Sequence, residues 1–324
     1  MRGRLSARHA TLLGLALAIA AIPWFFPSGF YFRMAALVWV SGLAAVGLQV
    51  LMGQAGQVSL GHAGFLGIGA YACALGPKLL GLPVLACLPL GAVLSGLTAL
   101  VVGRPILRLK GHALAVATLG FGVLVAMVLT GEHALTGGPD GIRVPRPELF
   151  GWRVRTAEAW YWITGGALWI GVWLALNLQD SLSGRALAAL HDSEVAARAL
   201  GVDAARHKLR AFVVAAVYAS VAGSLLGMMN GFVTPDAAGF LSSIEYVTMV
   251  VVGGLASVPG AVVGAALLVL LPQALTVFHE YEHALLGLLI MLFMIFLRQG
   301  VLPGLAGLLA GRRRVAAAPS RAEA

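Results

Sequence analysis

Apolar runs of roughly 20 residues, the length an α-helix needs to cross the hydrocarbon core of a bilayer, recur along this sequence and constrain its fold most strongly. A mean hydropathy of +0.91 and a charged fraction of only 11% agree with that reading. The 42 glycines suit helices that pack closely in lipid, where small residues let two backbones approach each other. The sequence therefore predicts an all-α polytopic membrane protein with about ten transmembrane or half-membrane helices.

The expected spans form one transmembrane domain over residues 11–310. They cover residues 11–26, 34–52, 53–76, 83–103, 113–129, 163–178, 211–231, 244–258, 261–278 and 284–297. The first run also resembles a signal peptide, but a retained span is the preferred interpretation. Residues 244–258 are short for a full crossing, so a half-helix paired with its neighbour is an alternative for them.

Basic residues lie at span ends and in short loops, the pattern that marks the cytoplasmic side of a membrane protein. Ten spans alternate without conflict if residues 1–10, 104–110, 183–210 and 311–324 are cytoplasmic and residues 131–158, 232–241 and 279–283 lie outside. Residues 1–10 are then a cytoplasmic N-terminal tail, and residues 311–324 a disordered cytoplasmic tail. The net charge of +9 reflects this topology, so the lipid bilayer is the expected partner and nucleic acid is not.

A polar segment at residues 183–210 interrupts the apolar pattern and contains eight of the 35 charged residues (22 Lys and Arg plus 13 Asp and Glu). Ser183 is a candidate N-cap, Glu194 and Arg198 form an i,i+4 pair, and Gly201 is a natural helix stop. The segment therefore predicts a short helix in water between two spans. Such a helix is either a docking device or a loop helix packed on lipid headgroups.

The glycine-rich stretch at residues 53–76 is apolar but also contains Gln54, Gln57, Ser59 and His62. These residues predict a broken helix entrance, followed by a tightly packed helix with Gly61, Gly64 and Gly67 on one face. Unwound backbone inside a membrane occurs only where protein or a water-filled cavity covers it. The four polar residues are therefore candidates for a translocation pathway, with a polar interfacial turn before an ordinary packing helix as the alternative.

Several kinds of chemistry have no support in the sequence. No phosphate-binding G-x-x-x-x-G-K-[ST] pattern occurs, and Cys73 and Cys87 lie within apolar runs, so neither a disulfide framework nor a metal site is expected. Residues 279–283 (HEYEH) match the letters of a zinc-protease motif but sit in a loop between spans. No carboxylate lies deep in an expected span apart from Glu245, which is close to a span end, and this scarcity argues against ion coupling. We expect no catalytic residues, and energy supplied from outside the chain.

Four ordered stretches resemble the permease (LivM-type) subunit of branched-chain amino-acid ABC importers. They are residues 53–71 (GQAGQVSLGHAGFLGIGAY), residues 108–122 with 135–142 (RLKGHALAVATLGFG and LTGGPDGI), residues 184–202 (GRALAALHDSEVAARALGV) and residues 249–265 (MVVVGGLASVPGAVVGA), with FLRQGVLPG at 296–304 as the end. The wider importer pattern of Glu, two Ala and Gly is met by Glu194, Ala196, Ala197 and Gly201. The Ile-x-Leu-Pro that can follow it elsewhere is missing.

The resemblance implies a multi-pass protein of the bacterial cytoplasmic (inner) membrane that forms half of a translocation pathway. Its implied partners are a second permease subunit (LivH-like), two ATPase subunits (LivG-like and LivF-like) that bind ATP and Mg, and an extracytoplasmic substrate-binding protein. No cofactor is implied for this chain. The resemblance also implies that this chain is coupled to the ATPase subunits through the segment after residue 183. The residues concerned are Gly184, Arg185, Glu194, Ala196, Ala197, Arg198 and Gly201. A urea or short-chain amide importer is the alternative within the family, and an uncoupled channel or secondary carrier the alternative outside it.

The expected outer loop contains a turn of Gly137, Gly138, Pro139, Asp140 and Gly141. Glycines on both sides of Pro-Asp favour a tight turn of fixed shape. An exposed, structured turn with one carboxylate is a candidate docking site for the binding protein, at Gly137, Gly138, Asp140 and Gly141. The alternative is a simple cap at the end of a span.

Overall fold

The computed structural model describes residues 2–149, 152–255, 257–275, 287–288, 291 and 300–301. Within them, eight helices are long and apolar enough to cross a membrane. These helices are α1 (Arg2–Phe25), α2 (Gly29–Gln49), α3 (His62–Leu80), α4 (Val84–Ile106), α5 (His112–Gly131), α7 (Ala157–Asp180), α10 (Ala204–Asn230) and α12 (Val258–Leu275). A shorter apolar helix, α11 (Phe240–Gly253), lies between α10 and α12.

Short elements connect these helices. They are α6 (His133–Thr136), α8 (Leu182–Asp192), α9 (Glu194–Ala199), the π-helical turn η1 (Val50–Gln54), and the 3-10 turns η2 (Gly138–Asp140) and η3 (Pro235–Ala238). Two antiparallel pairs of short strands complete the fold: β1 (Ile142–Arg143) with β4 (Phe232–Val233), and β2 (Glu148–Leu149) with β3 (Trp152–Arg153). The all-α polytopic fold expected from the sequence is confirmed.

Nine of the ten expected spans coincide with a described helix, while residues 279–283, nearly all of 284–297 and the tail 311–324 lie outside the described residues. The expected tail 1–10 continues α1, whose helix begins at Arg2. The short span at 244–258 corresponds to α11, which reaches the inner end of α2. There the side-chain amide of Gln49 donates a hydrogen bond to the carbonyl oxygen of Leu255.

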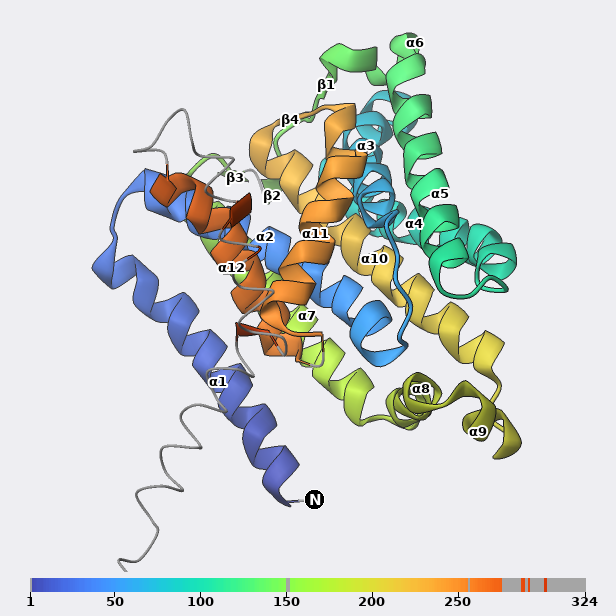
Figure 1. Ribbon diagram of the computed structural model, residues 1–324. Helices are drawn as coiled ribbons and strands as arrows, with labels where there is room; N and C mark the ends of the chain where they lie inside the picture. The colour runs from blue at the N-terminus through green and yellow to red at the C-terminus, as the bar shows by residue number, and fades with distance from the viewer. Residues whose placement is uncertain are drawn as a thin grey trace, which may run out of the picture.

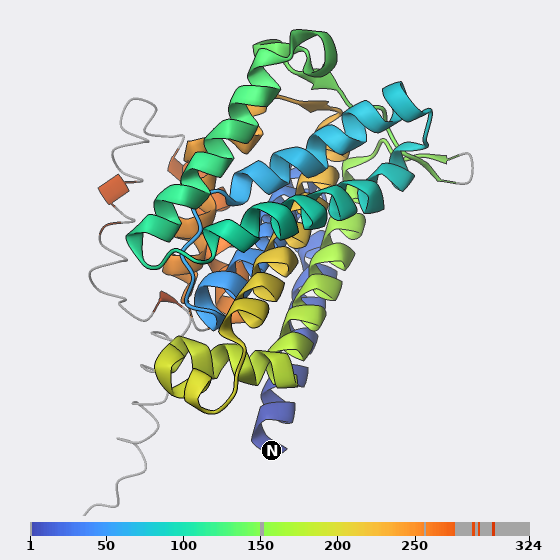
Figure 2. The same ribbon diagram turned by 90° about the vertical axis from the view of Figure 1, so that its right-hand side faces the viewer.

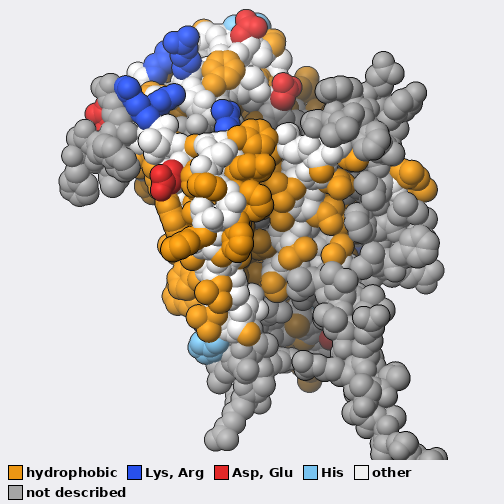
Figure 3. All heavy atoms as spheres, turned by 90° about the vertical axis from the view of Figure 1, so that its left-hand side faces the viewer, with side chains coloured by type: hydrophobic (Ala, Val, Ile, Leu, Met, Phe, Trp, Pro, Cys, Tyr) orange, Lys and Arg blue, Asp and Glu red, His pale blue; other side chains and the backbone are white. Residues whose placement is uncertain are grey.

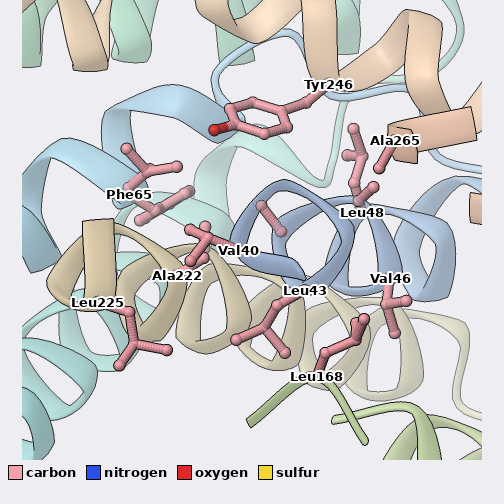
Figure 4. Close-up of a cluster of buried hydrophobic side chains, with 14 of the residues drawn as sticks. Val40, Leu43, Val46, Leu48, Phe65, Leu168, Ala222, Leu225, Tyr246 and Ala265 are labelled. Atoms are coloured by element: carbon pink, nitrogen blue, oxygen red, sulfur yellow. The ribbon is translucent and has the colours of Figure 1, made fainter. Parts of the chain in front are cut away.

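The buried core is centred on α2 (Figure 4). Val40, Leu43, Val46 and Leu48 of this helix are each at most 3% exposed. They are surrounded by buried side chains of other helices, among them Phe65 of α3, Leu168 of α7, Leu225 of α10, Tyr246 of α11 and Ala265 of α12. Helix α2 is thus the axis of the bundle, because its neighbours cover it on all sides.

The two ends of the bundle differ in the elements they carry (Figures 1 and 2). One end, called the outer end below, has β1, β4, α6 and η2. The opposite, inner end has α8, α9 and the start of α1. The pairing of Ile142 with Val233 shows that the loops around residues 131–158 and 232–241 share one end, as the alternation of spans predicted.

The face that carries α1 shows a band of hydrophobic side chains across its middle, with charged side chains gathered near the outer end (Figure 3). Large apolar residues such as Leu17, Val101 and Leu124 are more than 60% exposed on α1, α4 and α5. Exposed apolar surface of this extent on long helices suits contact with hydrocarbon. The fold is therefore that of an integral membrane protein.

Glycines bring α3 and α10 into direct backbone contact. A Cβ added to Gly223 of α10 would lie 1.9 Å from the carbonyl oxygen of Leu66 of α3, and one added to Gly69 would lie 2.0 Å from the carbonyl oxygen of Ser220. Gly61 and Gly64 face α5, while Gly67 faces Ala238 of η3, so the expected shared glycine face contacts two different elements. Small residues replace the hydrophobic drive that pairs helices in water.

We expect Gly223→Ala to destabilise the bundle by about 1–3 kcal/mol, the usual cost of overpacking, since backbone atoms of α3 would have to move. Thermal unfolding of the purified chain in detergent checks this. Gly120→Ala on α5 is the matched control, because no atom lies within 4 Å of a Cβ added there. Equal unfolding temperatures for the two variants would contradict the close approach of α3 and α10.

Candidate functional site

Two short helices, α8 and α9, form a hairpin at the inner end of the bundle between α7 and α10 (Figure 2). The sequence predicted one helix capped by Ser183, and this was wrong. The Ser181 hydroxyl caps α8 by accepting from the backbone N–H of Gly184 at 3.2 Å, and Ser193 caps α9 by accepting from that of Ala196 at 3.3 Å. Ser193 has an extended backbone that interrupts the helix, because serine side chains compete with helical hydrogen bonds.

The predicted pair of Glu194 and Arg198 is confirmed, with an Nη2–Oε1 distance of 2.5 Å. The structure adds a partner that the sequence analysis missed: Nζ of Lys208, on α10, donates to Oε2 of Glu194 at 2.9 Å. This hydrogen bond lowers the pKa of Glu194 below its ordinary value. Glu194 therefore fastens α9 to the first turns of α10.

The coupling residues implied by the resemblance differ in exposure. Ala197 is 2% exposed and packs with Leu190 and Ala204 in a small core inside the hairpin, so it does not face outward. Gly184 is buried against the end of α7, and Gly201 has the positive φ of +83° expected of a helix stop. Arg185, Ala196 and Arg198 are exposed.

Three large apolar side chains project from this otherwise polar hairpin. Leu182, Val195 and Leu200 are 77%, 81% and 84% exposed. The sequence analysis named none of them, although an apolar residue directly after Glu194 in a charged segment is the signal that could have found Val195. Exposed apolar side chains ringed by charges are typical of a protein contact surface.

The broken entrance predicted at residue 53 is present. Helix α2 ends in η1, a non-helical stretch at residues 55–61 follows (called the extended segment because it joins two helices), and α3 begins at His62 beside α2 and α11. Three backbone N–H groups in this region have defined acceptors: that of Gln57 donates to the Leu51 carbonyl, that of Leu60 to Thr118 Oγ1, and that of Ala63 to Ser243 Oγ. Protein covers part of this segment: Ala55, Gln57 and Ser59 are buried, while Gly56 and Val58 are exposed.

All four candidate pathway residues lie along this interruption and are buried, with exposures of 7% for Gln54, 5% for Gln57, 2% for Ser59 and 1% for His62. Nε2 of His62 lies 3.0 Å from the carbonyl oxygen of Ala44, and its ring contacts that of Tyr246 with centroids 6.0 Å apart. His62 is therefore a satisfied packing residue in this structure. Gln54 also lines a cavity at the inner end.

A cavity of about 490 Å³ opens at the inner end between α1, η1, α7 and α8. Charged walls come from Arg8, Asp180, Arg185 and Asp192, and Gln54 lines it from η1. His191 of α8 also lines it and touches the turn that follows η1: Gly56 has a φ of +64°, and a Cβ added there would lie 2.7 Å from Nδ1 of His191. The inner hairpin thus contacts the extended segment directly.

The predicted outer turn is present as η2, with positive φ angles at Gly137, Gly138 and Gly141. The Thr136 hydroxyl donates to the Leu129 carbonyl at 2.6 Å and accepts from the backbone N–H of Gly138 at 3.3 Å. Asp140 is exposed. The turn therefore has a fixed shape and presents one carboxylate at the outer end. Its docking role stays a prediction.

An interrupted helix with polar side chains, an inner cavity and a hairpin presented beyond the bundle fit a membrane permease subunit. The family model for the permease component of the branched-chain amino acid transport system matches residues 30–297. This chain belongs to that family.

The curated proteins that this chain resembles are also permease proteins. The chain is 36% identical over 314 residues to the high-affinity branched-chain amino acid transport system permease protein LivM of Escherichia coli K12, covering 89% of this chain and 74% of the relative. It is 27% identical over 212 residues to LivH of the same organism, covering 61% and 66%. It is also 29% identical over 187 residues to the autoinducer 2 import system permease protein LsrC of Klebsiella pneumoniae, covering 56% and 51%. No solved structure matches.

The ion pairs of Glu194 predict a pH dependence of the hairpin. Since its folded-state pKa is lowered, the stabilisation is fully present above the ordinary value of 4.5 and is lost as the pH falls through the lowered value. A spin label at the exposed Ala199 should stay ordered down to about pH 4.5 and become mobile below it. In Glu194→Gln the label should be mobile at every pH, whereas Asp192→Asn should behave like the parent. An ordered label in Glu194→Gln at neutral pH would contradict the role of this carboxylate.

Proposed function

We propose that this chain is one half of the translocation pathway of an ABC importer for branched-chain amino acids. Support for the substrate comes from the relatives, since both LivM and LivH are described as permeases for such amino acids. Similarity to both also supports pairing of this chain with a second, LivH-like permease subunit. The chain then catalyses no reaction itself, and ATP and Mg bind to two partner ATPase subunits, LivG-like and LivF-like.

The inner hairpin is the proposed contact with an ATPase subunit, and the observation that carries this is its exposed apolar surface. Val195 and Leu200 supply the apolar contact, while Arg185, Ala196 and Arg198 line its edge. Ala197, Gly184, Glu194 and Gly201 shape the hairpin, because they pack it, fasten it or end its helices. A folded hairpin can transmit force to the bundle because it is fixed to both α7 and α10.

The distribution of charge supports a cytoplasmic position for this hairpin and the N-terminus. Among the described residues, eleven Lys and Arg lie toward the inner end and six toward the outer end. The inner ones are Arg2, Arg4, Arg8, Arg104, Arg108, Lys110, Arg185, Arg198, Arg206, Lys208 and Arg210; the outer ones are Arg33, Lys78, Arg143, Arg146, Arg153 and Arg155. Excess positive charge marks the cytoplasmic side. The outer turn with Gly137, Gly138, Asp140 and Gly141 then faces the extracytoplasmic binding protein.

The proposed route for substrate follows the interruption between α2 and α3. Gln54, Gln57 and Ser59 supply polar groups there, and His62 fixes the start of α3 against α2. Movement of the hairpin, driven by the ATPase subunits, is transmitted to the bundle through His191. The ring of His191 touches Gly56 at the beginning of the extended segment. Movement of the hairpin is thereby passed to backbone that lines the route.

Reconstitution tests this proposal. Proteoliposomes with both permease subunits, both ATPase subunits and the binding protein should take up labelled leucine in an ATP-dependent manner. Val195→Asp should abolish most of this uptake, since a charge would be buried in the ATPase contact, whereas Val195→Ile should keep it. Recovery of the second permease subunit with each purified variant checks assembly. Uptake of urea or short amides instead of leucine would overturn the substrate, and full leucine uptake by Val195→Asp would overturn the contact.

A further inference from the structure

The inner cavity contains buried polar groups without partners. Both amide atoms of Gln54, Nε2 and Oε1, have no hydrogen-bond partner in the structure, although its side chain is more than nine-tenths buried. Nε of Arg8 is likewise buried and unpaired, while its Nη2 donates to Oδ1 of Asn177 and its Nη1 lies 4.0 Å from Oδ2 of Asp180. Both residues line the same cavity. Unpaired buried groups are costly, so they point to a ligand that completes them.

The charges around this cavity are of both signs. Arg8 and Arg185 face it from α1 and α8, while Asp180 and Asp192 face it from α7 and α8. Gln54 adds one unpaired donor and one unpaired acceptor. A ligand with a single charge would meet repulsion from one of these pairs. A zwitterion, which has an anion and an ammonium group close together, meets attraction from both.

We propose that this cavity is a binding site for a free α-amino acid on the inner side of the protein; the choice of leucine as its probe rests on the proposed function. The ligand carboxylate accepts from Nε–H of Arg8 and Nε2–H of Gln54, and its ammonium group donates to Oε1 of Gln54 and the Asp180 carboxylate. The aliphatic side chain lies toward Leu176 and Ala188, which also line the cavity. The volume of about 490 Å³ leaves room for such a ligand and several waters.

Occupation of this site has a mechanical consequence. The ligand would connect η1 with α7, which enters α8 directly through Ser181. Because α8 also touches Gly56, a bound amino acid opposes movement of the hairpin relative to the extended segment. A high amino-acid concentration on the inner side should therefore slow the ATPase cycle of the complex.

Binding of labelled L-leucine to the assembled complex in nanodiscs, without binding protein, tests the site. We expect saturable binding that 3-methylbutylamine and 4-methylpentanoate, which each lack one of the two charged groups, displace at least tenfold less well than leucine. Arg8→Gln and Gln54→Leu should each weaken binding about tenfold, the loss expected for a charge-assisted or buried hydrogen bond. Arg206→Gln is the matched control, since Arg206 is an exposed inner-end arginine outside this cavity.

Leucine binding should also reduce ATP hydrolysis by the parent complex but not by Arg8→Gln. Absence of saturable binding, or equal binding by Arg8→Gln and the parent, would overturn the site. If Arg8→Gln does not assemble, Asp180→Asn gives the same test. Binding that disappears in discs containing phosphatidylethanolamine would assign the cavity to a zwitterionic lipid headgroup and overturn the amino-acid site. Leucine uptake by the parent complex in proteoliposomes distinguishes failure of this site from failure of the proposed function. Without such uptake the proposed function is contradicted, whereas uptake without saturable leucine binding contradicts only the inner site.

Discussion

Hydrogen bonds to side-chain hydroxyls hold the passage from η1 to α3 in place at residues 55–63. A chain that leaves its helix inside a membrane protein exposes N–H groups that lipid cannot satisfy. Here the hydroxyls of Thr118 and Ser243 accept from Leu60 and Ala63. These acceptors come from α5 and α11, so the interruption exists only when three separate parts of the chain are packed together.

This interruption connects the inner hairpin with the polar interior of the bundle. Its first residues touch the inner hairpin through Gly56 and His191, and its last residue, Gly61, precedes an α3 that is fixed to α2 by His62. Regular helices transmit movement along their whole length, whereas an extended segment between two fixed points can change its path locally. The inner hairpin and the polar interior are therefore neighbours in space, and under the proposed function movement of the hairpin reaches the interior through this segment.

The sequence predicted the class of fold, the span positions and the broken entrance, because length, hydropathy and a cluster of Gly, Gln and Ser are local signals. It could not predict the partners of that entrance, since Thr118 and Ser243 lie 58 and 180 residues away from the groups they accept from. The pairing of Lys208 with Glu194 was likewise not predictable, because it forms only when the chain folds back between α9 and α10. The break at Ser193 was missed because Ala and Leu on both sides suggested one continuous helix, and the packing of Ala197 inside the hairpin follows from that break.

Under the proposed function, ATP-driven movement of the hairpin enters the bundle through the contact between His191 and Gly56. The most direct test measures ATP hydrolysed per leucine transported for Gly56→Ala in the reconstituted complex. Gly81→Ala is the control for backbone strain, because both glycines have a φ of +64° but no atom lies within 4 Å of a Cβ added at Gly81. We expect a severalfold higher ratio for Gly56→Ala alone, and partial recovery when His191→Ala removes the clash. Equal ratios for Gly56→Ala and Gly81→Ala would contradict it.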